Sequence, residues 1–297
     1  MLDELLAMQN DFCEYAKSKN NDDSLPWSSL FFMPQGEFFD IIYSGFGDDQ
    51  PSMSTEELRK DQRSEYYFAS FLEWLSRQEI ANRICSLRFD GDDEGANGTQ
   101  TWLFQRLINS DVVFPNLTSF SVRLTKPGDH NTCIIEGAPG DFDESGTIAK
   151  LVAKMPNLRN LEVPSAPDKS FFEMGPLPLW SLTVQAGYNH QNFIDNMAES
   201  DCFPHLHALD YSDYQTVFTE MAGTETQFAS YKKLFESKLF AEHPHFQFKL
   251  RYSILTRQQL SALMTVKNDC RARTRDVQFL YIDIKDGEYI EPHPVWS

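Results

Sequence analysis

A six-residue pattern of hydrophobic and variable residues recurs along this chain of 297 residues. Each copy has a hydrophobic residue, two variable residues, a second hydrophobic residue, one variable residue and a third hydrophobic residue. The copies occupy residues 84–89, 117–122, 158–163, 179–184, 206–211 and 277–282, and residues 246–250 alternate like a degenerate further copy. Two intervals, 21 and 27 residues, match a short strand–helix repeat, and the longer ones indicate insertions. This repetition predicts one structural unit used many times.

The segments between the copies have hydrophobic residues at helical spacing. Three copies follow a proline that ends a helix and favours extended backbone, namely Pro115, Pro156 and Pro204. Helices are predicted after three N-cap residues, Thr99, Ser145 and Thr256. Because parallel neighbouring strands need a crossover connection, this alternation predicts an α/β fold with a parallel sheet.

With these repeats, the chain resembles the irregular, insertion-bearing leucine-rich-repeat proteins of the bacterial cytosol, over roughly residues 80–290. The resemblance implies a strand–helix solenoid for residues 80–297, with an open sheet face that binds another protein. The family's usual asparagine after the strand is absent, and residues such as Pro164 and Ser212 stand in its place.

Residues 1–79 do not contain the repeat. They are predicted to form an α/β cap with a helix over 2–19, short strands within 21–53 and a second helix over 54–79. Ser54 and Glu57 have the spacing of a capping box at the start of that second helix. A cap would cover the end of the solenoid core; the alternative is a separate functional domain.

The charge of the chain is strongly acidic. It has 44 acidic and 26 basic residues, a net charge of −18, and residues 1–100 hold 20 of the acidic residues against 8 basic ones. Such a surface repels nucleic acid and anionic membranes and attracts basic proteins, although the charge could also serve solubility alone. No hydrophobic run has the length of a membrane span. Five scattered cysteines without metal-ligand spacing are expected to be reduced thiols, which places the protein in the cytoplasm.

Few local motifs point to chemistry. Residues 90–94 resemble the first half of a calcium loop, but position twelve is Thr101 instead of the required glutamate, so a solvated acidic loop competes with a cation site. The pairs His205/His207 and His243/His245 lie beside prolines that precede strands and have no obvious partner in a metal-ligand motif, so polar turn residues are the expected interpretation. No nucleophile, phosphate-loop or dinucleotide motif is present. We therefore expect a non-enzymatic protein without a metal or cofactor.

Strand alternation sorts the repeat residues into two faces. The hydrophobic positions should point into the core, and the variable ones should form the open face, with Arg123, Gln185 and Ser212 among them. Tyrosine and aspartate side chains suit a protein interface. The residues predicted to contact the partner are Arg88, Asp90, Glu162, Asp210, Asp213, Tyr214, Phe279, Tyr281 and Asp283.

These features predict a cytoplasmic protein-binding module whose partner is a basic protein. The most specific hypothesis is an immunity protein that neutralises a basic toxin by occlusion. Two alternatives remain: a scaffold or substrate-receptor subunit of a larger complex, and a metal-dependent hydrolase that uses acidic loops such as residues 141–144. The sequence leaves the oligomeric state open.

Overall fold

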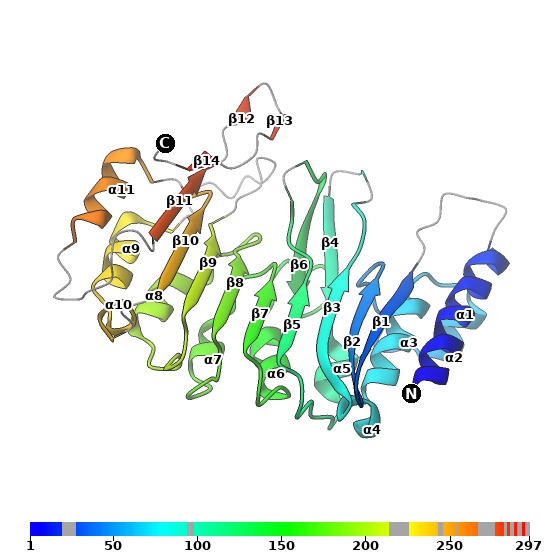
Figure 1. Cartoon of the computed structure of the whole chain (residues 1–297). Helices are drawn as coiled ribbons and strands as arrows, with labels where there is room; N and C mark the ends of the chain where they lie inside the picture. Colours follow the sequence, from blue (N-terminus) through cyan, green and yellow to red (C-terminus); the bar gives the residue numbers. More distant parts are fainter. Residues whose placement is uncertain are drawn as a thin grey trace.

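The protein is built around one twisted sheet of ten strands (Figure 1). The computed structural model describes residues 1–19, 28–93, 95, 98–126, 128–213, 226–242, 246–253 and 255–266, and the backbone of short strands between 277 and 294. The strand order is β1-β2-β3-β5-β7-β8-β9-β10-β11-β14. The bounds are β1 Ser29–Gln35, β2 Phe38–Ser44, β3 Ile84–Asp90, β5 Ser119–Val122, β7 Asn160–Val163, β8 Ser181–Gln185, β9 Ala208–Ser212, β10 Gln247–Arg251, β11 Val277–Tyr281 and β14 His293–Pro294.

The sheet is mostly parallel, which confirms the predicted α/β class. The eight strands from β2 to β11 run parallel, whereas β1 and β14 are antiparallel at the two edges. Every copy of the sequence pattern supplies one parallel strand, and the degenerate copy is β10. β2 lies in the segment predicted to be a cap, yet it pairs with β3 and extends the same sheet.

The helices lie along one side of the sheet. Figure 1 shows α3 to α8 behind it and α1 beside β1, so that no helix covers the front face of the described sheet. None of the described helices is long and apolar enough to cross a lipid bilayer. The bounds are α1 Leu2–Lys19, α2 Thr55–Lys60, α3 Tyr66–Leu75, α4 Gln78–Ala81, α5 Gln105–Asn109, α6 Thr147–Ala153, α7 Lys169–Phe172, α8 Phe193–Glu199, α9 Phe228–Phe235, α10 Lys238–Glu242 and α11 Arg257–Met264.

A repeated backbone irregularity explains why two variable residues separate the first two hydrophobic positions of the pattern. The N–H groups of Arg159 and Asn160 both donate to the Thr118 carbonyl, at 2.9 and 3.0 Å. Two residues thus stand opposite one, as in a bulge, and both Leu158 and Leu161 reach the core although they are three residues apart. The arrangement recurs for Trp180 and Ser181 on the Arg159 carbonyl and for His207 and Ala208 on the Trp180 carbonyl.

Aromatic packing joins the first 79 residues to the repeats. The ring centroid of Phe89 in β3 lies 5.8 Å from that of Phe68 and 6.0 Å from that of Phe71, both in α3. It also lies 6.3 Å from that of Tyr43 in β2. These rings are fully buried or nearly so. The hydrophobic core is therefore continuous across the boundary that was predicted between residues 79 and 80. Buried aromatic side chains contribute much of the stability of such a core.

Two predicted N-caps are confirmed and two are wrong. Ser54 and Thr256 form capping boxes with Glu57 and Gln259. Thr99 instead lies in β4 (Gly98–Leu103), which pairs in parallel with β6 (Asn131–Glu136) as a separate two-stranded sheet. The threonines of this segment favour extended backbone, and its hydrophobic spacing did not distinguish helix from strand.

The third cap, expected at Ser145, is provided by another residue. Ser145 has a positive φ of 47°, and α6 begins at Thr147. The Glu144 carboxylate accepts hydrogen bonds from the backbone N–H groups of Gly146 and Ile148, at 3.1 and 2.9 Å, and so satisfies the open end of the helix. The helix predicted over 54–79 is likewise divided into α2, α3 and α4, with a turn at Gln62 where φ is 56°.

Candidate functional site

The front face of the sheet presents a continuous row of side chains, one from each of the eight neighbouring strands from β1 to β10. We call it the central row. It consists of residues that pair directly across neighbouring strands: Phe31, Ile42, Arg88, Ser121, Glu162, Thr183, Asp210 and Lys249. At a strand spacing of about 4.8 Å the row is about 34 Å long. That length suits contact with a folded partner better than with a small molecule.

The row changes character along its length. At the β1 end, Phe31 and Met33 are 55 % and 57 % exposed, unusually high for large hydrophobic residues. In the middle, the neighbouring register positions hold small side chains: Ser86, Ser119, Asn160, Ser181 and Ala208. These residues leave the middle of the face low and polar, so a partner can approach the backbone closely there.

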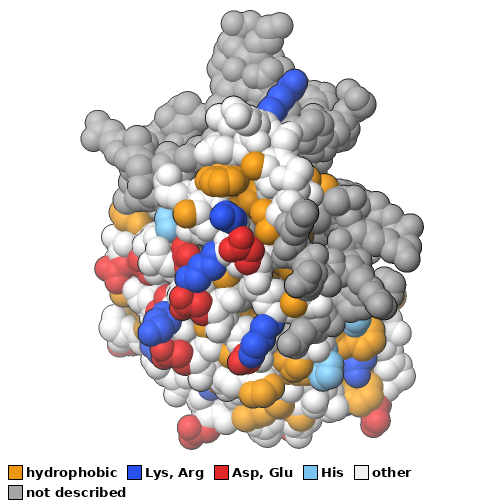
Figure 2. All heavy atoms as spheres, turned by 90° about the vertical axis from the view of Figure 1, so that its left-hand side faces the viewer, with side chains coloured by type: hydrophobic (Ala, Val, Ile, Leu, Met, Phe, Trp, Pro, Cys, Tyr) orange, Lys and Arg blue, Asp and Glu red, His pale blue; other side chains and the backbone are white. Residues whose placement is uncertain are grey.

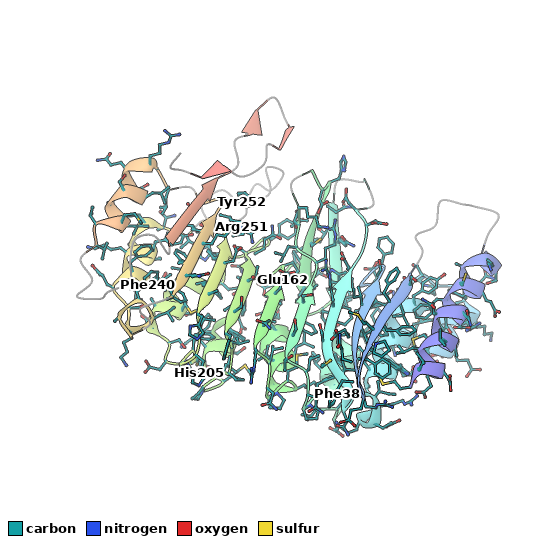
Figure 3. The ribbon with its side chains drawn as sticks, viewed as in Figure 1. Phe38, Glu162, His205, Phe240, Arg251 and Tyr252 are labelled. Carbon is teal, nitrogen blue, oxygen red and sulfur yellow. The ribbon has the colours of Figure 1, made fainter. Side chains whose placement is uncertain are left out.

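Glu162 occupies the centre of this face (Figure 3). It is half-buried between Ser121 and Thr183, its direct neighbours in register. Within the part of the chain that the structure describes, its carboxylate makes no hydrogen bond or ion pair. Burial raises the pKa of Glu162 above its usual value, and the charges of Arg88 and Arg251 only partly oppose this shift. A partly desolvated carboxylate that makes no direct ion pair with a described residue is a position that a partner's cation could occupy.

The other acidic residues predicted for the face are already paired. Asp210 contacts Nε of Arg251 at 2.7 Å and Nζ of Lys249 at 3.0 Å. Asp90 accepts a hydrogen bond from Nη2 of Arg88 at 2.6 Å. A basic partner would therefore have to displace an internal cation at either position, which makes Asp90 and Asp210 weaker attractors than Glu162.

Asp213 was predicted to contact a partner, and this prediction is wrong. Its side chain is buried, and it accepts hydrogen bonds from the Tyr231 hydroxyl at 2.9 Å, from the Tyr211 hydroxyl at 3.2 Å and from the N–H and hydroxyl of Thr226. Burial raises the pKa of Asp213, although the bonds from Tyr231 and Thr226 oppose the shift. The residue anchors α9 to the end of β9, a long-range role that alternation within one strand does not reveal.

Among the remaining predicted residues, the structure describes the side chain of Arg88 alone. Arg88 is exposed on the central row. Phe279 and Tyr281 lie in β11, whose side chains are not among those described, and Tyr214 and Asp283 lie outside the described residues.

Three other residues expected on the open face, Arg123, Gln185 and Ser212, are buried. The segment that carries β4 and β6 explains this for Arg123 and for Gln185, whose amide oxygen accepts a hydrogen bond from the Thr125 N–H at 2.8 Å. Arg123 donates to the Gln100 amide oxygen at 3.0 Å and pairs with Asp129 at 2.9 Å. It also contacts the thiol of Cys133 at 2.8 Å, and burial raises the pKa of that thiol to about 11. The segment that carries β4 and β6 thus covers the carboxyl end of β5. It leaves open the middle of the front face and the part formed by the amino-terminal ends of the strands.

Carboxylates of the two acidic loops accept hydrogen bonds from other residues of the chain. Asp93 accepts hydrogen bonds from the backbone N–H groups of His130 and Asn131 at 2.9 and 3.0 Å. Burial opposes its ionisation, but these bonds hold the pKa of Asp93 below the usual value. In the second loop, Asp143 accepts from the Gln191 amide at 2.7 Å. No group of three or more His, Cys, Asp or Glu residues positioned to hold a metal occurs among the described residues.

The predicted histidine pairs and cysteines are also placed in part. His205 and His207 are exposed, and the His207 ring lies against Trp180, while His243 and His245 lie outside the described residues. Cys13, Cys85, Cys133 and Cys202 are free thiols, and Cys270 is outside the described residues.

Charges at the end of the molecule that carries α9 and α10 compensate one another. Figure 2 shows acidic and basic side chains interspersed on this end. Lys233 contacts Glu199 at 2.5 Å and Asp195 at 3.4 Å, and Lys238 contacts Asp201 at 3.0 Å. This end therefore offers less uncompensated charge to a partner than Glu162 does.

Comparison of the chain with protein families, with curated proteins and with solved structures finds no match. Its function must therefore be inferred from its own residues and their geometry.

Proposed function

We propose that this chain is a non-enzymatic protein-binding module, organised as a leucine-rich-repeat-like solenoid, that captures a basic protein on the front face of its sheet. The observation that carries the proposal is Glu162, a half-buried carboxylate without a described partner at the centre of an otherwise charge-balanced face. A lysine or arginine of the partner would supply the missing counter-charge. Desolvated charge pairs at the centre of an interface affect affinity strongly.

The order of the strands supports the solenoid part of the proposal. From β2 to β11, each parallel strand of the sheet lies next to the parallel strand that comes before it in the chain. The helices between these strands lie on one side of the sheet. Stacked strand–helix units of this kind leave one face of the sheet free for binding.

The hydrophobic end of the central row supports a second contact. Phe31 and Glu162 lie four strands apart, which is about 19 Å. A partner that places a hydrophobic side chain on Phe31 and Met33 and a cation on Glu162 would gain both burial and charge pairing. Pro34 lacks a backbone donor and makes addition of a further strand beside β1 unfavourable, so side-chain docking is the better-supported mode.

The net charge of −18 supports the narrower form of the proposal, an immunity protein that blocks a basic toxin by occlusion. Long-range attraction would speed association, and the close pair at Glu162 would slow dissociation.

Affinity capture from the native cell tests the proposal. Wild type should retain a basic protein that is released by salt, and Glu162→Lys should abolish retention. Glu173→Lys is the matched control because Glu173 is an exposed residue at the end of α7 and the change in charge is the same. Equal capture by wild type and Glu162→Lys would remove the assignment to the sheet face. Salt-insensitive capture of a large assembly would favour the scaffold alternative. If the captured protein arrests growth when expressed alone but not with this chain, the immunity role is supported.

A further inference from the structure

A second group of exposed side chains lies at the amino-terminal ends of three neighbouring strands. Arg159, Trp180 and His207 occupy the bulge positions that precede β7, β8 and β9, and their backbones are linked by the hydrogen bonds of those bulges. We call this group the Arg–Trp–His row. All three side chains are exposed, and Trp180 is 50 % exposed. The extra residue in each bulge turns these side chains outward instead of into the core.

The three side chains contact one another in sequence. Cζ of Arg159 lies 5.4 Å from the centroid of the Trp180 ring, within the range of a cation–π contact. The Trp180 and His207 rings meet edge to face, with centroids 5.4 Å apart and an interplanar angle of 75°. The aromatic contact holds the guanidinium by its face and leaves its N–H edge available for a planar anion.

The row offers hydrogen-bond donors and lacks acidic partners. Arg159, His205 and His207 form no ion pair with any carboxylate in the described ranges of the chain. The guanidinium and the indole N–H are donors only, and a histidine ring can donate as well. The chain has a net charge of −18, so the row is a local group of donors with positive charge in an acidic protein. Its position beside the strands of the sheet holds it in place.

We infer that the Arg–Trp–His row is a second binding surface, which takes a carboxylate-bearing segment of a protein. One carboxylate of the bound segment accepts hydrogen bonds from two N–H groups of Arg159. The Trp180 ring packs against the aliphatic part of the side chain that carries this carboxylate. The row spans two strand spacings, about 10 Å, which fits one or two carboxylates. A long polyanion such as nucleic acid would extend beyond the row and be repelled by the acidic remainder of the chain.

This surface is separate from Glu162 and has opposite charge preference. Glu162 lies in β7, three residues after Arg159, which is a distance of about 10 Å along the extended chain. A partner of Glu162 and a partner of the Arg–Trp–His row can therefore be distinguished by their charge, and either site can fail a test without the other.

The test titrates the full-length chain with acetylated, amidated hexaglutamate at low salt and measures binding by calorimetry. Wild type should bind, salt should weaken binding, and Arg159→Gln and Trp180→Ala should each weaken it about tenfold. The matched control is Lys150→Gln, an exposed residue of α6 whose loss changes the net charge equally; it should bind like wild type. Circular dichroism shows whether each variant is folded.

Three outcomes would overturn the inference. Absence of binding by wild type, or equal weakening by Arg159→Gln and Lys150→Gln, would show that the row does not recognise carboxylates. Inorganic phosphate serves as the second probe. If phosphate binds in an Arg159-dependent manner while hexaglutamate does not, the ligand is a phosphate and the assignment to an acidic protein segment is wrong.

Discussion

Replacing Glu144 by glutamine is expected to remove a pH dependence from the stability of the fold. The Glu144 side chain is buried and accepts backbone hydrogen bonds from Gly146, Ile148 and Asp168, the last at 2.7 Å. Burial raises the pKa of Glu144 to about 7, although the bonds from Ile148 and Asp168 work against that shift. The carboxylate therefore joins the start of α6 to the loop before α7 at an electrostatic cost that depends on pH.

The magnitude follows from proton linkage. The unfolded chain releases this proton near the ordinary value of 4.5, whereas the folded chain holds it up to about pH 7. The contribution to stability is therefore complete below 4.5 and is lost as the pH rises through 7. Between about pH 5.5 and about pH 8 the loss is about 2 kcal/mol. For a chain of 297 residues this corresponds to a fall in Tm of about 3 °C.

Urea unfolding of wild type and Glu144→Gln across this pH range measures the effect. Glutamine cannot titrate, so the difference in unfolding free energy between the two proteins should change by about 2 kcal/mol with pH. Glu173→Gln, on an exposed residue, should follow wild type within about 0.5 kcal/mol. Parallel curves for wild type and Glu144→Gln would refute the reasoning. Stabilisation of wild type but not of Glu144→Gln by a divalent cation would instead favour the metal-hydrolase alternative.

Three further predictions concern carboxylates near the front face. Asp213→Ala should lower the unfolding free energy by about 3 kcal/mol, because the Tyr211, Tyr231 and Thr226 donors lose a buried acceptor; a thermal melt that matches wild type would contradict this. Glu162→Gln should raise stability by about 1 kcal/mol, since it removes an unpaired desolvated charge. Asp210→Asn should instead lower stability, because it breaks the ion pairs to Lys249 and Arg251; melting temperatures that shift in the same direction in these two variants would sink the distinction between them.

The sequence pattern located the strands well because it records a local property. In each copy the hydrophobic positions must reach one core, and the bulge at residues such as Arg159 and Asn160 fits the two variable positions to that requirement. The capping boxes at Ser54 and Thr256 were predictable for the same reason, since both partners lie within four residues. Thr99 was misassigned because β4 is stabilised by pairing with β6, more than 30 residues away.

The candidate site was only partly predictable. Alternation placed Arg88, Glu162 and Asp210 on the front face, as the strand pairing shows. It could not show that Asp210 is neutralised by two cations of β10, whereas Glu162 lacks a partner among the described residues. The Arg–Trp–His row had no signal in the pattern, because its members were treated as variable positions. Only the alignment of three bulges brings these side chains together.

The chain by itself determined the class of fold, the positions of its parallel strands and the acidic net charge, because hydrophobic spacing and charge are properties of residues in order. Tertiary structure decided which charges remain unpaired and which surfaces remain open. The β4–β6 insertion buried Arg123, the segment around Thr226 and Tyr231 enclosed Asp213, and register between strands left Glu162 alone at the centre. These outcomes depend on contacts between residues far apart in the sequence, whose energies no local pattern contains.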